Sequence, residues 1–233
     1  MSQAKRVSIV SIALAAAAMF IVAAVPAYSA NAARSAQDRV RDAVRIVEKM
    51  KRNPGLARIL DTAKGVFIIP HYGKGAFIVG GQGGGGVVLA HRGGAWTSPA
   101  FYSIGGGSIG AQIGGEGGSI AMILMTRRAV ERFANASKPW SLNGNAGLTV
   151  VNWSGRSETS TSRHDVIMWS NTKGLYGGLT ASVTRISPDT RMDARYYGSR
   201  VNSREILAGR VSSPSSGPLR EALASRVAST QRY

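Results

Sequence analysis

Between residues 65 and 118, short apolar runs alternate with clusters of glycine. This segment holds 19 of the 29 glycines and only three formally charged side chains. Apolar runs of four to six residues bounded by Gly or Pro are typical of strands, because a buried helix needs about ten residues or more. Glycine also disfavours helix. The pattern therefore predicts a sheet whose glycines mark turns, bulges and close backbone approaches. The runs are Val66–Ile69, Ala76–Val79, Val87–Ala90 and Phe101–Ile104.

The preceding segment, residues 35–50, has helical periodicity, and Asn53-Pro54-Gly55 ends the pattern. A short second helix is expected over residues 56–63. The apolar stripe of the first helix predicts docking on the sheet; the alternative is a basic amphipathic helix lying on a membrane surface. The apolar face is small, which favours docking. Its stripe consists of Val40, Ala43, Val44, Val47 and Met50.

After the glycine-rich segment, the pattern predicts further strands and short helices. Strands are expected over 119–125, 146–153, 166–170 and 175–186, and a helix over 127–136 with Val130 and Phe133 facing the core. Another helix should begin at Ser187-Pro188-Asp189, with Pro188 at its first helical position, and end at Gly198. A short helix over 203–208, a linker over 212–217 and a final helix over 218–229 complete the chain. The expected fold class is α+β: a mainly antiparallel, barrel-like sheet with flanking short helices.

The N-terminus has the pattern of an export signal. Lys5 and Arg6 precede an apolar run over residues 7–25, which is followed by small residues around Ala27 and Ala30. The alternative is a permanent membrane anchor, since about 19 apolar residues nearly span a bilayer. The expected organisation is a signal peptide over 1–30, a helical segment over 31–62, a β-rich domain over 63–211, and a linker with a C-terminal helix over 212–233.

The charge balance points to anionic partners. The formal net charge is +17, and most basic residues are Arg, whose planar fork suits phosphate. The absence of Cys excludes disulfides, thiolate metal sites and Cys nucleophiles. Two groups of basic residues, chosen by proximity in the sequence, are candidates for contacting lipid headgroups. The first is Lys49, Lys51, Arg52, Arg58, Lys64 and Lys74, and the second is Arg127, Arg128, Arg132 and Lys138.

Two motifs resemble known sites without their required context. Residues 81–86 satisfy G-x-G-x-x-G but lead into a predicted strand, whereas a dinucleotide site needs a helix there. Residues 106–110 satisfy G-x-S-x-G around Ser108, but the residues that follow are Gly-rich rather than helical. The three histidines are isolated in sequence and are expected at the surface or in hydrogen bonds, not as metal ligands. The four tryptophans are expected in the core or at sheet edges, with one or two at a membrane interface as the alternative.

Several short motifs follow one another between about Ala63 and Val211: Lys64–Pro70, Phe77–Val87, Trp96–Ala100, Gly110–Gly114, Gly144-Asn145, Lys173–Gly178 and Tyr196–Gly198. Their order resembles that of the SYLF domain family of actin-patch-type lipid-binding domains. The resemblance implies a compact domain, mainly antiparallel β with flanking helices, that binds membrane phospholipids and has no catalytic residues. For eukaryotic relatives it implies phosphoinositides and, in some, actin. One departure is Gly117-Gly118-Ser119, where similar sequences often carry an Asp.

Together these observations favour an exported, non-enzymatic module that binds anionic phospholipid headgroups at a membrane surface, periplasmic or associated with the outer membrane. The alternative is a structural or interaction protein of the cell envelope with a protein partner. A hydrolase at Ser108 is a third hypothesis. The sequence predicts no cofactor and no metal. Nucleic-acid binding is disfavoured because the basic residues are scattered and the export signal removes the chain from the genome.

Overall fold

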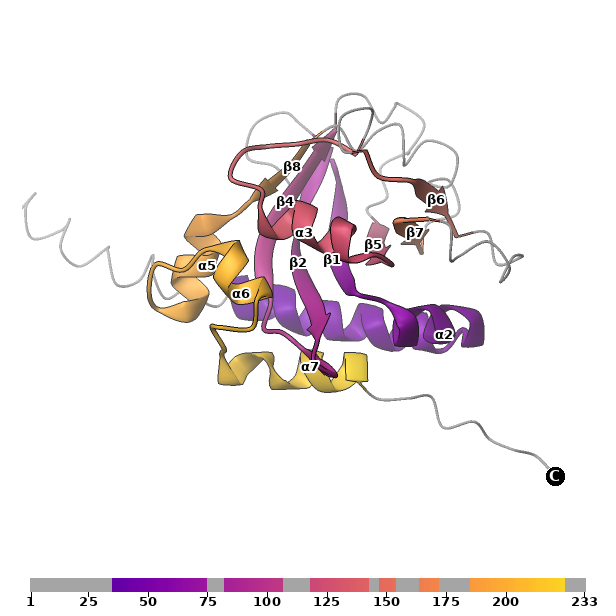
Figure 1. Cartoon of the computed structure of the whole chain (residues 1–233), viewed down its shortest axis with the longest axis horizontal. Coiled ribbons are helices and arrows are strands. Elements are labelled where there is room, and N and C mark those ends of the chain that lie inside the picture. Colours follow the sequence, from indigo (N-terminus) through magenta and orange to yellow (C-terminus); the bar gives the residue numbers. More distant parts are fainter. Residues whose placement is uncertain are drawn as a thin grey trace, which may run out of the picture.

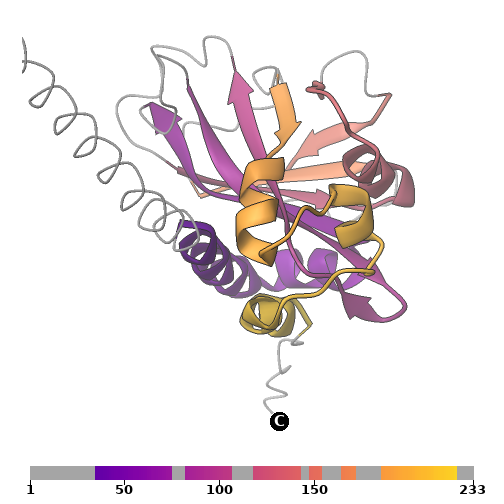
Figure 2. The same ribbon diagram turned by 90° about the vertical axis from the view of Figure 1, so that its left-hand side faces the viewer.

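The computed structural model describes residues 35–74, 82–106, 118–142, 147–153, 164–171 and 185–224. A curled sheet is covered by short helices on both faces (Figures 1 and 2), so the predicted α+β class is confirmed. The export signal, the run Ala76–Val79 and Ser108 lie outside the described residues.

The sheet is antiparallel except at one edge. Its strand order is β6-β7-β5-β1-β2-β4-β8, β3 pairs with β2, and the β6–β7 pair is parallel. The predicted strands that fall within the described residues form one sheet centred on β1 and β2, while residues 175–184 of the last predicted strand lie outside them. The strands are β1 (Gly65–Lys74), β2 (Gln82–Arg92), β3 (Ala95–Trp96), β4 (Ala100–Gly106), β5 (Gly118–Leu124), β6 (Val150–Asn152), β7 (Val166–Ser170) and β8 (Arg185–Pro188).

The sheet divides the core into two clusters, one on each of its faces. The helix over residues 35–51, here the N-terminal helix, packs on one face with α2 (Pro54–Thr62) and α7 (Gly217–Ala224). The other face is covered by α3 (Arg127–Ala134) and α6 (Ser203–Leu207), while α5 (Thr190–Tyr197) packs against β4 (Figure 2). Among the described residues, none of these helices is both long and apolar enough to cross a bilayer.

The apolar stripe of the N-terminal helix docks on the sheet, as predicted. Val40, Ala43, Val47 and Met50 are buried in the same cluster as strand residues such as Ile68. Because this stripe is covered by the sheet, it is not available to insert into a membrane surface. All four tryptophans are also buried, as expected.

Two helix starts differ from the sequence prediction because a polar residue caps each helix. Asn53 ends the first helix and also begins α2: its side chain accepts hydrogen bonds from the Gly55 and Leu56 N–H groups, so α2 starts at Pro54. The expectation that Pro188 is the first helical residue is wrong. Pro188 pairs with Tyr102 at the end of β8, and α5 begins at Thr190 after its cap Asp189. Gly198 ends α5 with a positive φ of 69°, as predicted.

The segment expected as a linker, residues 212–217, contains a 3-10 turn (η2, Pro214–Ser216) that packs against the sheet domain. Ser216 is fully buried, and its hydroxyl lies 2.9 Å from that of Ser98. The following helix α7 buries Leu219 and Leu223.

The strands β1 and β2 approach closely at a bulge between Ile68 and His71. A Cβ placed on Gly86 would lie 2.3 Å from the Ile68 carbonyl oxygen and 2.6 Å from the Phe67 ring. Such distances are far inside van der Waals contact, so this position in the sheet accepts only glycine without movement of the backbone.

A buried carboxyl group joins α5 to β4. Asp193 is fully buried, and its Oδ1 accepts a hydrogen bond from the Phe101 N–H at 2.8 Å, while its Oδ2 lacks a partner within the described chain. Burial raises the pKa of Asp193 to about 7; the Phe101 N–H partly offsets this, and the charge of Asp189 adds to it. The folded chain therefore holds the Asp193 proton more tightly than the unfolded chain does.

This burial predicts a pH dependence of stability. The stabilising proton on Asp193 is present below the ordinary carboxyl pKa of 3.8 and is lost as the pH rises through about 7. We expect the thermal midpoint of the wild-type chain to fall over this range, and Asp193→Asn, which mimics the protonated group, to remove part of that fall. Thermal denaturation in a pH series measures both, and identical slopes in the two proteins would contradict the prediction.

Candidate anion-binding site

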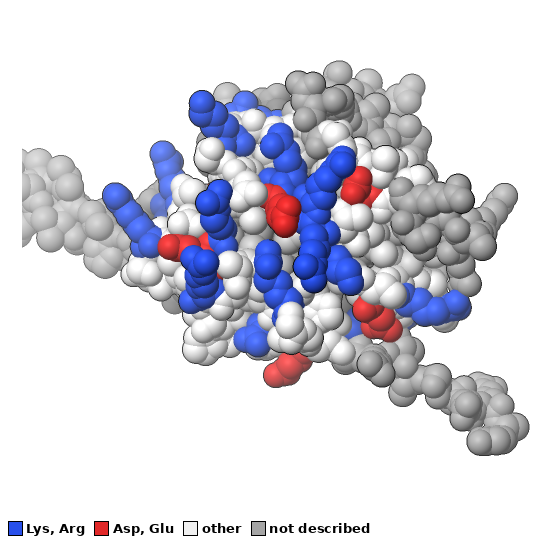
Figure 3. Space-filling model, viewed as in Figure 1, with Lys and Arg blue, Asp and Glu red and all other residues white. Residues whose placement is uncertain are grey.

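Basic side chains gather on the face of the molecule that carries α3 and α6, with few acidic groups between them (Figure 3). Within this face lies a pocket of about 370 Å³, here called the basic pocket. It lies where the end of α2, the end of β2 and the start of α3 meet. Its walls are Lys64, His91, Arg92, Gly93, Gly94, Arg127, Val130 and Glu131.

Lys64 is held at the pocket by its backbone. Its N–H donates to the Leu124 carbonyl oxygen and its carbonyl oxygen accepts from the His91 N–H, both at 2.8 Å. The neighbouring residue Gly65 lies directly beneath α3: a Cβ there would be 2.8 Å from Val130 Cγ2. The missing side chain therefore lets α3 pack closely enough to form a wall of the pocket next to Lys64.

Arg92 comes from the tight hairpin between β2 and β3. Arg92 pairs with Ala95, and the two residues between them, Gly93 and Gly94, have positive φ angles of 56° and 81°, as a two-residue hairpin turn requires. The Arg92 Nε donates a hydrogen bond of 2.8 Å to the Leu207 carbonyl oxygen at the end of α6. This bond fixes the side chain of Arg92, which lines the pocket.

The third cation comes from the first turn of α3. Thr126 caps this helix by accepting a hydrogen bond from the Ala129 N–H, so Arg127 is its first residue. Glu131 follows one turn later and lines the same pocket. The described residues thus bring three cations, one carboxylate and the half-buried His91 ring, which stacks on Trp96 at 5.0 Å, around one cavity.

The structure brings together only two of the sequence-predicted candidates in this pocket, Lys64 and Arg127, one from each group. Lys49, Arg52 and Arg58 are exposed on the N-terminal helix, the turn after it and α2, which cover the opposite face of the sheet. Lys138 is exposed beyond α3, and the side chain of Lys74, the last residue of β1, lies outside the described part.

Three other candidates have structural contacts of their own. Lys51 Nζ donates to the Leu223 carbonyl oxygen at 2.9 Å and so fastens α7; burial lowers its pKa, which Asp61 partly offsets. Arg128 lies 4.0 Å from the Asp165 carboxylate. Arg132 lies over the Trp140 ring at 4.9 Å.

The sequence prediction missed Arg92, His91 and Glu131. The Gly93-Gly94 pair was a usable signal, because two glycines between apolar runs predict a hairpin that would bring its flanking residues to one end of the sheet. Nothing in the sequence spacing placed that hairpin beside α3.

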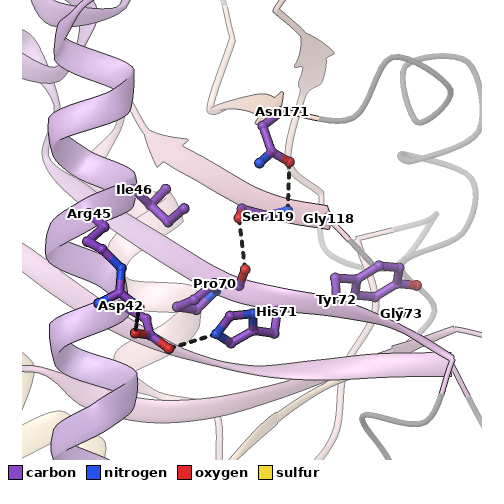
Figure 4. Close-up of a pocket in the computed structure, with 10 residues that line it drawn as sticks. All are labelled: Asp42, Arg45, Ile46, Pro70, His71, Tyr72, Gly73, Gly118, Ser119 and Asn171. Carbon is purple, nitrogen blue, oxygen red and sulfur yellow. Dashed lines mark hydrogen bonds and ion pairs between the residues drawn. The ribbon is translucent and has the colours of Figure 1, made fainter. Parts of the chain in front are cut away.

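A second pocket of about 310 Å³ lies between the N-terminal helix, β1 and β5 (Figure 4). Its charged groups are paired with one another: the Asp42 carboxylate binds both Arg45 and His71, the latter at 2.7 Å. Ser119, in the segment where similar sequences carry an Asp, donates its hydroxyl to the Pro70 carbonyl oxygen at 2.8 Å, and its N–H donates to Asn171. This pocket therefore offers less uncompensated charge to a ligand than the basic pocket does.

The described residues give no support to the G-x-G-x-x-G motif, and Ser108 of the G-x-S-x-G motif lies outside them. Residues 82–86 of the G-x-G-x-x-G segment run as part of β2, so no helix begins after them to hold a pyrophosphate. Among the described residues, no three His, Asp or Glu side chains come together as a metal site.

The fold and the arrangement of its motifs define a known class. Residues 105–226, just over half of the chain, match the Ysc84 family, described as "Las17-binding protein actin regulator". The chain therefore belongs to the Ysc84 (SYLF) family, and the resemblance derived from its motifs is confirmed at that level.

Individual relatives are fungal. The chain is 29% identical over 144 residues to "Protein YSC84" of Saccharomyces cerevisiae, covering 59% of this chain and 31% of that protein. It is 26% identical over 143 residues to "SH3 domain-containing protein PJ696.02" of Schizosaccharomyces pombe, covering 59% of this chain and 33% of that protein. It is 29% identical over 137 residues to "LAS seventeen-binding protein 3" of S. cerevisiae, covering 56% of this chain and 30% of that protein. The match thus spans about a third of each relative's length.

Proposed function

We propose that this chain is a non-enzymatic module that binds anionic phospholipid headgroups at a membrane surface, and that the basic pocket is its headgroup site. The observation that carries the proposal is the convergence of Lys64, Arg92 and Arg127 from three separate elements on one cavity. Two of these cations are Arg, which can bind a phosphate group through two parallel N–H···O bonds.

The expected energy is sufficient for surface binding. Each Lys or Arg held near an anionic bilayer contributes about 1 kcal/mol, so three contribute about 3 kcal/mol, or roughly a hundredfold in affinity. The remaining basic residues on the same face add long-range attraction that salt screens.

Removing the three pocket cations tests this proposal. We expect Lys64→Ala/Arg92→Ala/Arg127→Ala to lower the affinity for vesicles containing phosphatidylglycerol by about a hundredfold, measured by vesicle co-sedimentation at physiological salt. The matched control is Lys49→Ala/Arg52→Ala/Arg58→Ala, which removes the same charge from the helices on the opposite face. Equal losses in the two triple variants, or equal binding of the wild type to neutral vesicles, would contradict a headgroup site at the pocket.

The N-terminal residues indicate the cellular compartment in which this binding would take place. The basic residues and apolar run over 1–25 suit an export signal, so we propose that the mature protein is exported and acts in the periplasm or at the outer membrane. N-terminal sequencing of the protein recovered from its native compartment tests this: a mature N-terminus near Ala27 or Ala30 supports export, and an intact Met1 contradicts it.

Binding of a protein partner is the second candidate function. It is favoured by the family's description and by the printed name "LAS seventeen-binding protein 3", both of which refer to a protein ligand. A complex that survives detergent and high salt in affinity capture would support this function. Loss of all captured partners under those conditions would count against it.

A further inference from the structure

Glu131 is a carboxylate in a pocket otherwise lined by cations. It lies one helical turn after Arg127 on α3, and both side chains line the pocket together with Lys64 and Arg92. Within the described residues, the Glu131 carboxylate forms no ion pair with any of these cations. The pocket therefore presents positive and negative groups side by side, each available to a ligand.

An acidic group at this position opposes the binding of a simple anion. Its negative charge lowers the attraction that the three cations exert on a phosphate. Glu131 also adds little to the stability of α3. Arg127 precedes it by four residues, and this order of a cation and an anion stabilises a helix less than the reverse order does. The arrangement is instead complementary to a ligand that carries a cation next to its anion.

We infer that the basic pocket selects phospholipid headgroups with a primary ammonium group beside the phosphate, with Glu131 binding the ammonium and Lys64, Arg92 and Arg127 binding the anionic groups. Phosphoserine fits best: its phosphate and carboxylate provide two anions for three cations, and its ammonium provides the partner for Glu131. This inference rests on the proposed headgroup function and adds the class of headgroup to it.

The volume of the basic pocket is large enough for a phospholipid headgroup. A volume of about 370 Å³ lies near the lower end of the range for small-molecule sites, roughly 300–1,000 Å³. Val130 is buried at its base, and the Gly93-Gly94 turn forms a wall without side chains. The pocket can thus admit a polar headgroup at its mouth while the acyl chains stay in the bilayer.

Phosphatidylserine and phosphatidylglycerol separate this inference from general charge attraction, because each carries one net negative charge. Each lipid is mixed at the same mole fraction into vesicles of a neutral lipid. We expect the wild type to bind the phosphatidylserine vesicles about tenfold more tightly than the phosphatidylglycerol vesicles, because one charge-assisted hydrogen bond provides about this difference in affinity. Glu131→Gln should lower the affinity for phosphatidylserine and raise that for phosphatidylglycerol, so that the preference disappears. Glu221→Gln, an exposed glutamate on α7 with the same charge change, should leave the preference intact.

Soluble probes distinguish the headgroup from phosphate alone. We expect glycerophosphoserine to displace the wild-type protein from phosphatidylserine vesicles at concentrations where inorganic phosphate does not; equal displacement by both would overturn the role of the ammonium group. Equal wild-type binding to the two lipids, or an unchanged preference in Glu131→Gln, would overturn the inference while the proposed function stands. Binding to neither lipid would overturn the proposed function and this inference with it.

Discussion

Replacing Phe133 by Ala is expected to lower the free energy of unfolding by about 3–5 kcal/mol, the usual cost of removing a buried phenylalanine ring. Phe133 is fully buried on α3, and its ring contacts those of Phe67, Tyr102 and Trp140 at centroid distances of 5.3, 5.4 and 5.1 Å. It is the ring that anchors α3 to the sheet, so the cavity would also loosen the helix that carries Arg127 and Glu131. Urea denaturation followed by tryptophan fluorescence measures the loss.

The control for this change is Phe133→Leu, which keeps most of the volume and should cost less than about 1.5 kcal/mol. If Phe133→Ala were no more costly than Phe133→Leu, the four-ring cluster would not be the attachment of α3 that the structure describes.

Replacing Gly86 by Ala is the second change with a large expected effect, about 3 kcal/mol. The added methyl group would meet the Ile68 carbonyl oxygen at 2.3 Å, and a backbone atom in a central strand cannot move aside as the end of a side chain can. This strain exceeds the gain of up to about 1 kcal/mol that Ala brings by restricting the unfolded chain.

Gly217→Ala provides the matched control for Gly86→Ala. Gly217 has a helical backbone, with φ −47° and ψ −58°, and its nearest neighbour to an added Cβ is the end of the Glu221 side chain at 4.0 Å. Here Ala should be neutral or stabilising. Thermal denaturation of both variants checks the difference, and a similar cost at the two positions would show that contact with Ile68 is not the cause.

The fold was largely predictable because its local signals agree with its packing. The runs Val66–Ile69, Val87–Ala90 and Phe101–Ile104 all lie in central strands, and the stripe that includes Val40 and Val47 faces the sheet. Runs of β-branched and aromatic residues between glycines have few alternatives to a buried strand. The errors fall at element boundaries, where one cap such as Asp189 decides which residue begins the helix.

The site was less predictable because it depends on where separate elements meet. Proximity in the sequence grouped Lys64 with Lys49, Lys51 and Arg52, yet α2 lies between them and carries the chain from one face of the sheet to the start of the central strand β1. Lys64 instead lies with Arg92 and Arg127, which are 28 and 63 positions further along (92 − 64 and 127 − 64). The pairing of β1 with β2 and β5 brings these residues together, and that register follows from tertiary packing.

The charge count also overstated the number of cations available to a ligand. Lys51 and Arg220 each donate to a backbone carbonyl oxygen, of Leu223 and Trp96 respectively. Both bonds hold α7 in place, so the long basic side chains contribute to tertiary structure as well as to surface charge. For this chain, net charge alone is therefore a poor measure of affinity for a membrane.

The glycine at position 65 offers a diagnostic that can be applied to other chains of the family. Since a methyl group there would lie 2.8 Å from Val130 Cγ2, the glycine determines how closely α3 can approach Lys64 and so how narrow the basic pocket is. Chains that combine a lysine with glycine at these adjacent positions should retain a closed cavity, whereas a bulkier residue should open it into a shallow depression. Under the proposed headgroup function, these two positions would separate family members that select individual headgroups from those that respond only to overall surface potential.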